Sequence, residues 1–161
     1  MAAAQIVAGV SQPSPQTVPV TTIKTYRIDG VETDCFVQLF GDVVVIGVSQ
    51  LKGRIGTYVL CETEQDVMDQ KPRFSQTTLL GKREDPLLDV YARAMAEKIA
   101  SMRESSNDTC PSILLGMSLQ EKGRGNGTSS DKATDSGALF RTLVNLLGNL
   151  YLEAVQTAMA G

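Results

Sequence analysis

The sequence predicts an α+β fold, in which a six-stranded antiparallel sheet carries two main helices on one face. Segments with strand composition come first and are separated by tight-turn signals, Asp29-Gly30 and Gly41-Asp42. The two long segments with helical periodicity come late, after residue 85. Strands joined by tight turns pair antiparallel, so this order favours α+β over alternating parallel units.

A single domain is expected. The chain has 161 residues, of which 42% are hydrophobic, and a chain of this length buries roughly 68–70% of its unfolded surface in one core. Residues 1–16 are small and polar and include two prolines, a composition that buries too little apolar surface to fold. We therefore expect a flexible tail over residues 1–16 and one domain over residues 17–161.

Six segments are rich in Val, Ile, Thr and aromatic residues and are bounded by turn residues, as strands are. Two tight turns join the first three of them, and a basic loop around Gly53 joins the third to the fourth. An acidic loop, Glu62–Pro72, precedes the fifth strand, and a polar loop that ends at Pro111 precedes the sixth. The expected strands are Thr17–Ile28, Val31–Phe40, Val43–Ser49, Gly56–Cys61, Phe74–Leu80 and Ser112–Leu119.

Two helices are expected. Asp85 can cap the first, and Pro86 fits its first position, where the missing N–H costs nothing. Its apolar stripe, at steps of three and four, contains Leu88, Tyr91, Met95, Ile99 and Met102. A polar, glycine-rich connection over Gln120–Asp131 leads to the second helix, roughly Asp135–Ala158. The apolar face of that helix contains Leu139, Phe140, Leu143, Leu147, Leu150, Tyr151 and Ala154.

The segment Val43–Ser49 reads VVVIGVS, an unbroken apolar run rather than an alternating one. In an antiparallel sheet such a run indicates a strand that is covered on both faces. Two helices make one layer and cover one face, so we expect the other face to pair with a partner subunit. The sequence leaves open which side chains face the partner: Val44, Ile46 and Val48, or Val43 and Val45.

The composition excludes several classes of function. Histidine is absent, which excludes Ser-His-Asp and Cys-His catalysis, and no catalytic, cofactor or metal site is indicated. A net charge of −3 without a basic cluster argues against nucleic acid as a partner. No membrane span is expected, because polar residues interrupt the longest apolar segment, Leu139–Val155. No Lys or Arg precedes Lys24 to form an export signal, and three scattered cysteines fit a cytoplasmic or nuclear protein.

Four carboxylates fall within eight residues of the acidic loop, namely Glu62, Glu64, Asp66 and Asp69. A calcium loop needs a glycine and a bidentate glutamate at fixed offsets, and the segment does not have them. Two interpretations stay open. The segment is either a solvated loop or an acidic surface that contacts a basic patch on a partner.

Several short motifs match one known family in the same order along the chain. The closest match is Leu79-Leu80-Gly81, followed by Glu84–Leu88 and by Val90-Tyr91-Ala92 on the first helix. The other matching pieces are Gly30-Val31, Thr33, Val43–Val48, Gln50, Gly56-Thr57 and Ile113-Leu114-Leu115. On these residues, from about Thr21 to Val155, the chain resembles the proteasome assembly chaperone 3 family. None of the pieces is a catalytic motif.

The resemblance implies a small α+β chaperone, not an enzyme, that helps to build the α ring of the 20S proteasome core particle and is released during maturation. It implies pairing, sheet against sheet, with a related chaperone subunit as a heterodimer, and it leaves open a homodimer when the chain is alone. The candidate pairing residues are Val43, Val44, Val45, Ile46 and Val48. The candidate contacts with proteasome α subunits are Glu62, Glu64, Asp66 and Asp69.

Three features depart from the family pattern and leave open the choice of partner and the contact with α subunits. The N-terminal tail and the Gln120–Asp131 connection are longer than expected, and the acidic loop differs in composition. Two other classes of function also stay open. One is a scaffold or adaptor of a trafficking or signalling complex that uses a similar sheet surface. The other is a histidine-free enzyme with paired carboxylates or a lysine, which would need a deep polar cleft.

Overall fold

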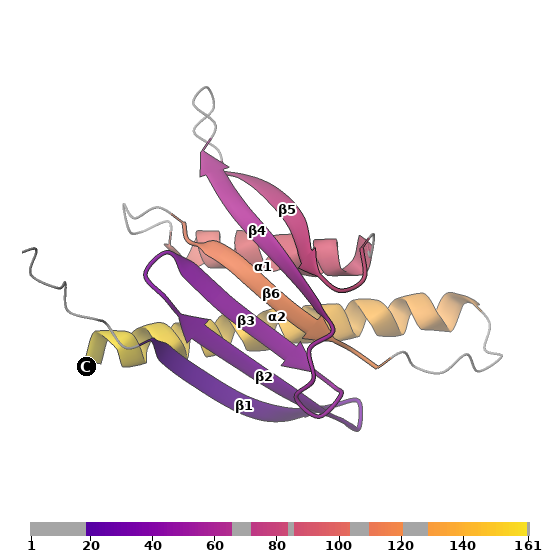
Figure 1. Cartoon of the computed structure of the whole chain (residues 1–161). Helices are drawn as coiled ribbons and strands as arrows, with labels where there is room; N and C mark the ends of the chain where they lie inside the picture. The colour runs from indigo at the N-terminus through magenta and orange to yellow at the C-terminus, as the bar shows by residue number, and fades with distance from the viewer. Residues whose placement is uncertain (1–18, 66–71, 84–85, 104–109, 121–128, 161) are drawn as a thin grey trace, which may run out of the picture.

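The computed structural model describes residues 19–65, 72–83, 86–103, 110–120 and 129–160 (Figure 1). Six strands and two helices follow the predicted order, which confirms the α+β class. They are β1 (Val20–Ile28), β2 (Val31–Leu39), β3 (Val43–Ser49), β4 (Thr57–Gln65), β5 (Pro72–Leu80), α1 (Pro86–Arg103), β6 (Ser112–Ser118) and α2 (Ser129–Ala160). The predicted tail and the predicted cap, Asp85, lie outside the described residues.

The strands form one sheet in the order β1-β2-β3-β6-β4-β5. The sheet is mixed and not purely antiparallel as expected, because β3 and β6 run parallel, with Val43 opposite Ser112. The other neighbouring pairs are antiparallel. The reason is topological: β3 and β4 run in opposite directions and β6 inserts between them, so β6 must be parallel to one of the two. The order of strands in the sequence does not reveal such an insertion.

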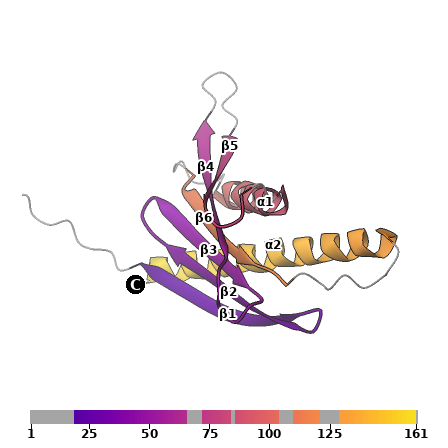
Figure 2. The ribbon, with the colours of Figure 1, turned by 45° about the vertical axis from the view of Figure 1, so that its right-hand side comes forward.

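Both helices lie on the same face of the sheet (Figures 1 and 2). α1 packs on β4, β5 and β6, α2 packs on β1 and β2, and the two helices contact each other. The rings of Tyr91 and Phe140 join the helices edge to face, with centroids 4.8 Å apart. The residues of the predicted stripes that are buried in this layer are Leu88, Tyr91, Met95, Ile99, Leu143, Leu147, Leu150, Tyr151 and Ala154.

The side chains of β3 alternate between the two faces of the sheet. Val44, Ile46 and Val48 belong to the core on the helix side and are 2%, 0% and 0% exposed. Val43 and Val45 are half-buried and lie on the opposite face, because successive side chains of a strand point to opposite sides. The face that the helices cover, which the sequence left open, is therefore the face of Val44, Ile46 and Val48.

β4 and β5 are longer than the sequence predicts. β4 continues to Gln65 and β5 begins at Pro72, so Glu62 and Glu64 lie on a paired strand and not in a loop. Their polar sequence has weak strand propensity, and pairing with β5 overrides it. The acidic loop that was predicted from residue 62 is therefore shorter than expected.

α2 also begins earlier than predicted, at Ser129 and not near Asp135, which shortens the connection predicted over Gln120–Asp131. The apolar pattern that locates this helix in the sequence begins only at Leu139, so the first turns carry no such signal. Within the described ranges, neither helix combines the length and the apolar character that a membrane crossing needs.

Gly81 and Gly30 form a matched pair for a stability test. Both have a positive φ, 97° and 78°, but only at Gly81 would an added Cβ meet backbone atoms, those of Gly56 and Thr57. Gly30→Ala should cost only the strain of a left-handed conformation, about 1–2 kcal/mol. Gly81→Ala should lower the free energy of unfolding further, because the backbone at residue 81 must also move away from the backbone of Gly56 and Thr57. Urea unfolding measures both, and equal losses would contradict a rigid close approach at Gly81.

Candidate partner-binding face

In the described part of the chain, no helix covers the sheet face opposite α1 and α2, which we call the open face (Figure 2). Six residues in register, one from each strand, cross this face from edge to edge. This transverse row consists of Ile23, Phe36, Gly47, Gly116, Tyr58 and Leu80. Aliphatic and aromatic side chains thus lie on either side of two central glycines.

A second row in register lies beside the first and is apolar at its centre. It consists of Thr21, Gln38, Val45, Leu114, Leu60 and Thr77. Together the two rows make an apolar band across the open face. Ile23 and Leu80, at the two ends of the transverse row, are 69% and 64% exposed. Exposed apolar surface that is continuous across a whole sheet is unusual for a face that stays in water.

Polar residues border the apolar band on both sides. Thr25 donates a hydrogen bond to Asp34 at 2.8 Å, next to the cross-strand neighbours Arg27 and Glu32. The other border is mixed: Glu62 on β4 is exposed and lies opposite Ser75, whereas Val43 on β3 is apolar and lies opposite Ser112. An apolar centre with a polar rim is the usual organisation of a protein–protein interface.

The rings of two aromatic residues lie over the central glycines. Gly47 and Gly116 face each other across the β3–β6 pair, and both are buried although they belong to the open face. A Cβ on Gly47 would overlap the ring of Phe36, and a Cβ on Gly116 would lie 2.7 Å from Cε1 of Tyr58. The absence of a side chain at both positions therefore makes room for the rings.

The structure divides the predicted pairing residues between the two faces of the sheet. Val43 and Val45 lie on the open face, whereas Val44, Ile46 and Val48 are enclosed in the core. Val45 lies between Gln38 and Leu114, and Leu60 continues the same row on β4. Leu60, Leu114 and the two aromatic residues of the transverse row, Phe36 and Tyr58, were not among the predicted pairing residues. Alternation along each strand could have found them, but only with the helix-covered side already known.

The predicted acidic residues are only partly described. Glu62 and Glu64 lie on β4, opposite Ser75 and Arg73 of β5, and both are exposed. Asp66 and Asp69 lie outside the described residues. Among the side chains that the structure describes, no three from His, Cys, Asp and Glu come together in a way that could hold a metal ion.

Two cysteines are buried on the helix side of the sheet. Cys35 and Cys61 are both 0% exposed. Burial raises the pKa of the Cys35 thiol to about 12 and that of the Cys61 thiol to about 11, because the thiolate loses its solvation. Both thiols are therefore protonated at neutral pH, which makes them weak nucleophiles.

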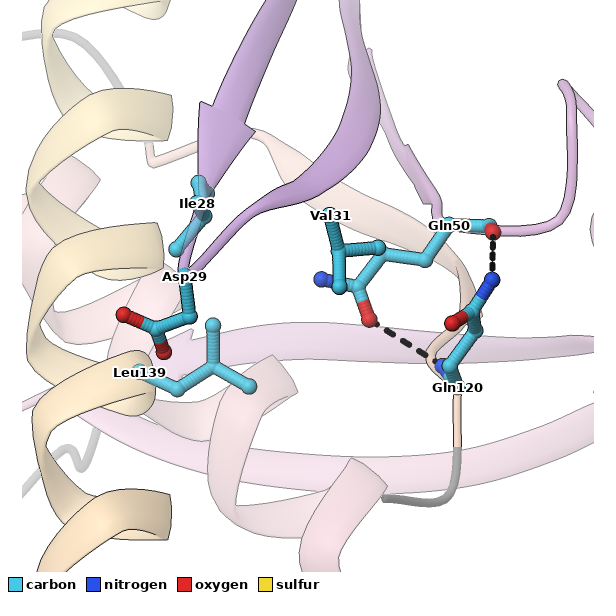
Figure 3. Close-up of a pocket in the computed structure, with 6 residues that line it drawn as sticks. All are labelled: Ile28, Asp29, Val31, Gln50, Gln120 and Leu139. Carbon is cyan, nitrogen blue, oxygen red and sulfur yellow. Dashed lines mark hydrogen bonds between the residues drawn. The ribbon is translucent and has the colours of Figure 1, made fainter. Parts of the chain in front are cut away.

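A buried polar cluster around Gln50 closes one end of the sheet (Figure 3). The Nε2 of Gln50 donates to Oγ1 of Thr33, and its Oε1 accepts from the backbone N–H of Gln120, both at 3.1 Å. Nε2 of Gln120 donates in turn to the carbonyl oxygen of Gln50 at 3.0 Å. The adjoining cavity has a volume of about 30 Å³ and is lined by Ile28, Asp29, Val31, Gln50, Gln120 and Leu139. It has room for one or two water molecules but not for a substrate.

Comparisons with known proteins agree with this architecture. The model of the proteasome assembly chaperone 3 family matches residues 46–129, which is more than half of the chain. Curated protein sequences give no match. A chain from the crystal structure of a chaperone complex for yeast 20S proteasome assembly has a similar fold, with a TM-score of 0.50 and 14% sequence identity. This match covers 81% of the present chain and 98% of the yeast chain, and at this identity it concerns the fold alone.

Burial of the two sheet cysteines predicts an order of alkylation. In native protein at pH 8, iodoacetamide should modify the partly exposed Cys110 first and leave Cys35 and Cys61 protected, because only a solvent-accessible thiolate reacts. Peptide mass spectrometry gives the modified fraction of each cysteine, with urea-unfolded protein as the control in which all three react. Equal rates for Cys61 and Cys110 in the native protein would contradict the burial.

Proposed function

This chain belongs to the proteasome assembly chaperone 3 family, and from that membership we propose that it is a non-catalytic chaperone of 20S proteasome assembly. The observation that carries the proposal is the open face, where an apolar band with a polar rim crosses all six strands. A surface of this kind suits a protein that works by binding other proteins.

The occupant that we propose for the open face is a related chaperone subunit. Six strands of seven to nine residues present roughly 600 Å², at about 4.8 Å between strands and about 3.3 Å per residue. A standard interface buries about 800 Å² on each partner, so the face approaches the size that a stable pair needs. The similar yeast chain belongs to a chaperone complex, which supports a paired state.

Val43 and Val45 are the residues of the predicted pairing set that we propose to contact this partner. A second sheet would cover them at an intersheet distance of about 10 Å, with the side chains of the two faces interdigitated. Val44, Ile46 and Val48 support the same strand from within the core. For the chain in isolation, a second copy can take the place of the related subunit, and the complex is then a homodimer.

The pair would act by binding proteasome α subunits and ordering their association into the α ring. Glu62 and Glu64 are exposed near the end of β4, a strand that projects beyond its neighbours in Figure 1. There they can meet a basic patch, and we propose Asp66 and Asp69 as further contacts. Release requires only that the finished ring binds the pair less tightly than the intermediate does. Binding and release of this kind need no catalytic group.

Affinity capture of the tagged chain from its own cells tests the proposed function. Mass spectrometry should find proteasome α subunits together with one related chaperone subunit in stoichiometric amount. A matched sample from untagged cells removes background proteins. Recovery of vesicle-coat or kinase-scaffold components without any α subunit would contradict the proposal and favour a scaffold.

Two neighbouring valines of β3 distinguish the pairing face from the core. Val45→Glu places a charge on the open face and should leave a folded chain that no longer captures its partner subunit, since a paired face would bury the charge. Val44→Glu places the same charge in the core and should unfold the chain. Circular dichroism reports folding and size-exclusion chromatography reports pairing. If Val45→Glu pairs as well as the wild type, the pairing surface is elsewhere.

A further inference from the structure

The lack of a side chain at Gly47 and Gly116 sets how far the aromatic rings above them project from the open face towards solvent. They lie opposite each other on the two central strands, each of which is hydrogen-bonded on both sides. The rings of Phe36 and Tyr58 occupy the space that their Cβ atoms would take. A Cβ at residue 47 would displace the ring of Phe36 and not the backbone, because a side chain can rotate towards solvent whereas a central strand is held by its ladders.

A raised ring would change the fit of a partner sheet. Two sheets that pack face to face approach to about 10 Å, and their side chains fill the interface at the density of a protein interior. A ring displaced outward at the centre would hold the second sheet away from the neighbouring apolar residues, Val45 and Leu114. Contacts across the band would then be lost over an area larger than the ring itself.

The transverse row also favours one type of occupant. Read from either edge of the sheet, it runs aliphatic, aromatic, glycine, glycine, aromatic, aliphatic. A sheet with the same pattern, turned by half a turn, would therefore meet the same succession of residues. This agrees with a partner subunit of the same fold.

We propose that Gly47 and Gly116 are positioning residues for pairing, which keep Phe36 and Tyr58 low enough for the sheet of the related chaperone subunit to close on the open face. Neither glycine contacts the partner, because the rings lie between. The inference rests on the proposed function and adds to it the residues that select the partner sheet.

The test compares Gly47→Ala with a matched glycine variant. Gly41 lies in the turn between β2 and β3, and a Cβ added there would have nothing within 4 Å, so Gly41→Ala controls for the loss of a glycine. The probe is the related chaperone subunit that copurifies with the wild-type chain, and titration calorimetry gives the Kd. Gly47→Ala should raise the Kd about tenfold or more, and Gly41→Ala less than about twofold. Circular dichroism and melting temperature check that both variants stay folded.

A second pair of variants tests Gly47→Ala after the ring of Phe36 has been removed. Leucine at residue 36 is shorter than phenylalanine, so in the Phe36→Leu background the addition of Gly47→Ala should change the Kd less than about twofold. A purely structural role for Gly47 would weaken pairing by the same factor in both backgrounds, and that result would overturn the proposal. Should Gly47→Ala fail to fold, Gly116→Ala with and without Tyr58→Leu gives the comparison on the other side of the row. It is made in an Ile55→Ala background, because a Cβ at residue 116 would also lie 2.9 Å from Cγ2 of Ile55.

The remaining outcomes separate this inference from the proposed function. If the wild-type chain pairs and Gly47→Ala pairs with the same Kd, the inference is overturned and the proposed function stands. If no related chaperone subunit binds the wild-type chain, both are overturned.

Discussion

The parallel pairing of β3 with β6 is the contact on which the rest of the structure depends. It joins a unit of β1 and β2 beneath α2 to a unit of β4 and β5 beneath α1. Neither hairpin with one helix would bury much of a core alone, since small sheets need further strands or helices for stability. The paired strands supply buried residues from both, such as Ile46 and Leu115. Folding of the whole domain therefore requires a contact between segments that lie far apart in the sequence.

The same two strands impose a constraint on the outer surface. β3 and β6 each carry apolar side chains on both faces, and a single layer of helices can cover only one of these faces. Val45 and Leu114 consequently remain on the open face, where the aromatic side chains from β2 and β4 extend the apolar surface to either side. The helices complete a core on one face of the sheet, and the other face keeps its apolar residues uncovered. An apolar face of this kind supports the proposed function, which is to bind another protein.

The elements with local signals could be predicted from the sequence. Asp29 and Gly30 have φ values of 50° and 78°, as a tight hairpin turn of two residues requires, and Pro86 begins α1. The insertion of β6 could not be predicted, because it depends on pairing between distant segments. The run Val43–Ser49 predicted a strand with two covered faces, and the structure shows the helices on one of them. The transverse row takes one residue from each strand, so only the register of the finished sheet brings its members together.

The hydrogen bonds of Gln50 favour the observed register of β6 against β3 over shifted registers. Its amide is engaged through both its oxygen and its nitrogen, and it ties the end of β3 to the segment that follows β6. A slip of β6 by one residue would break these bonds, leave a buried amide unpaired and exchange Leu114 on the open face for Leu115 from the core. The register that satisfies the buried amide of Gln50 is thus the same register that places Leu114 on the open face. Under the proposed function, a subunit that binds the open face would therefore bind only a chain whose β6 is in the correct register.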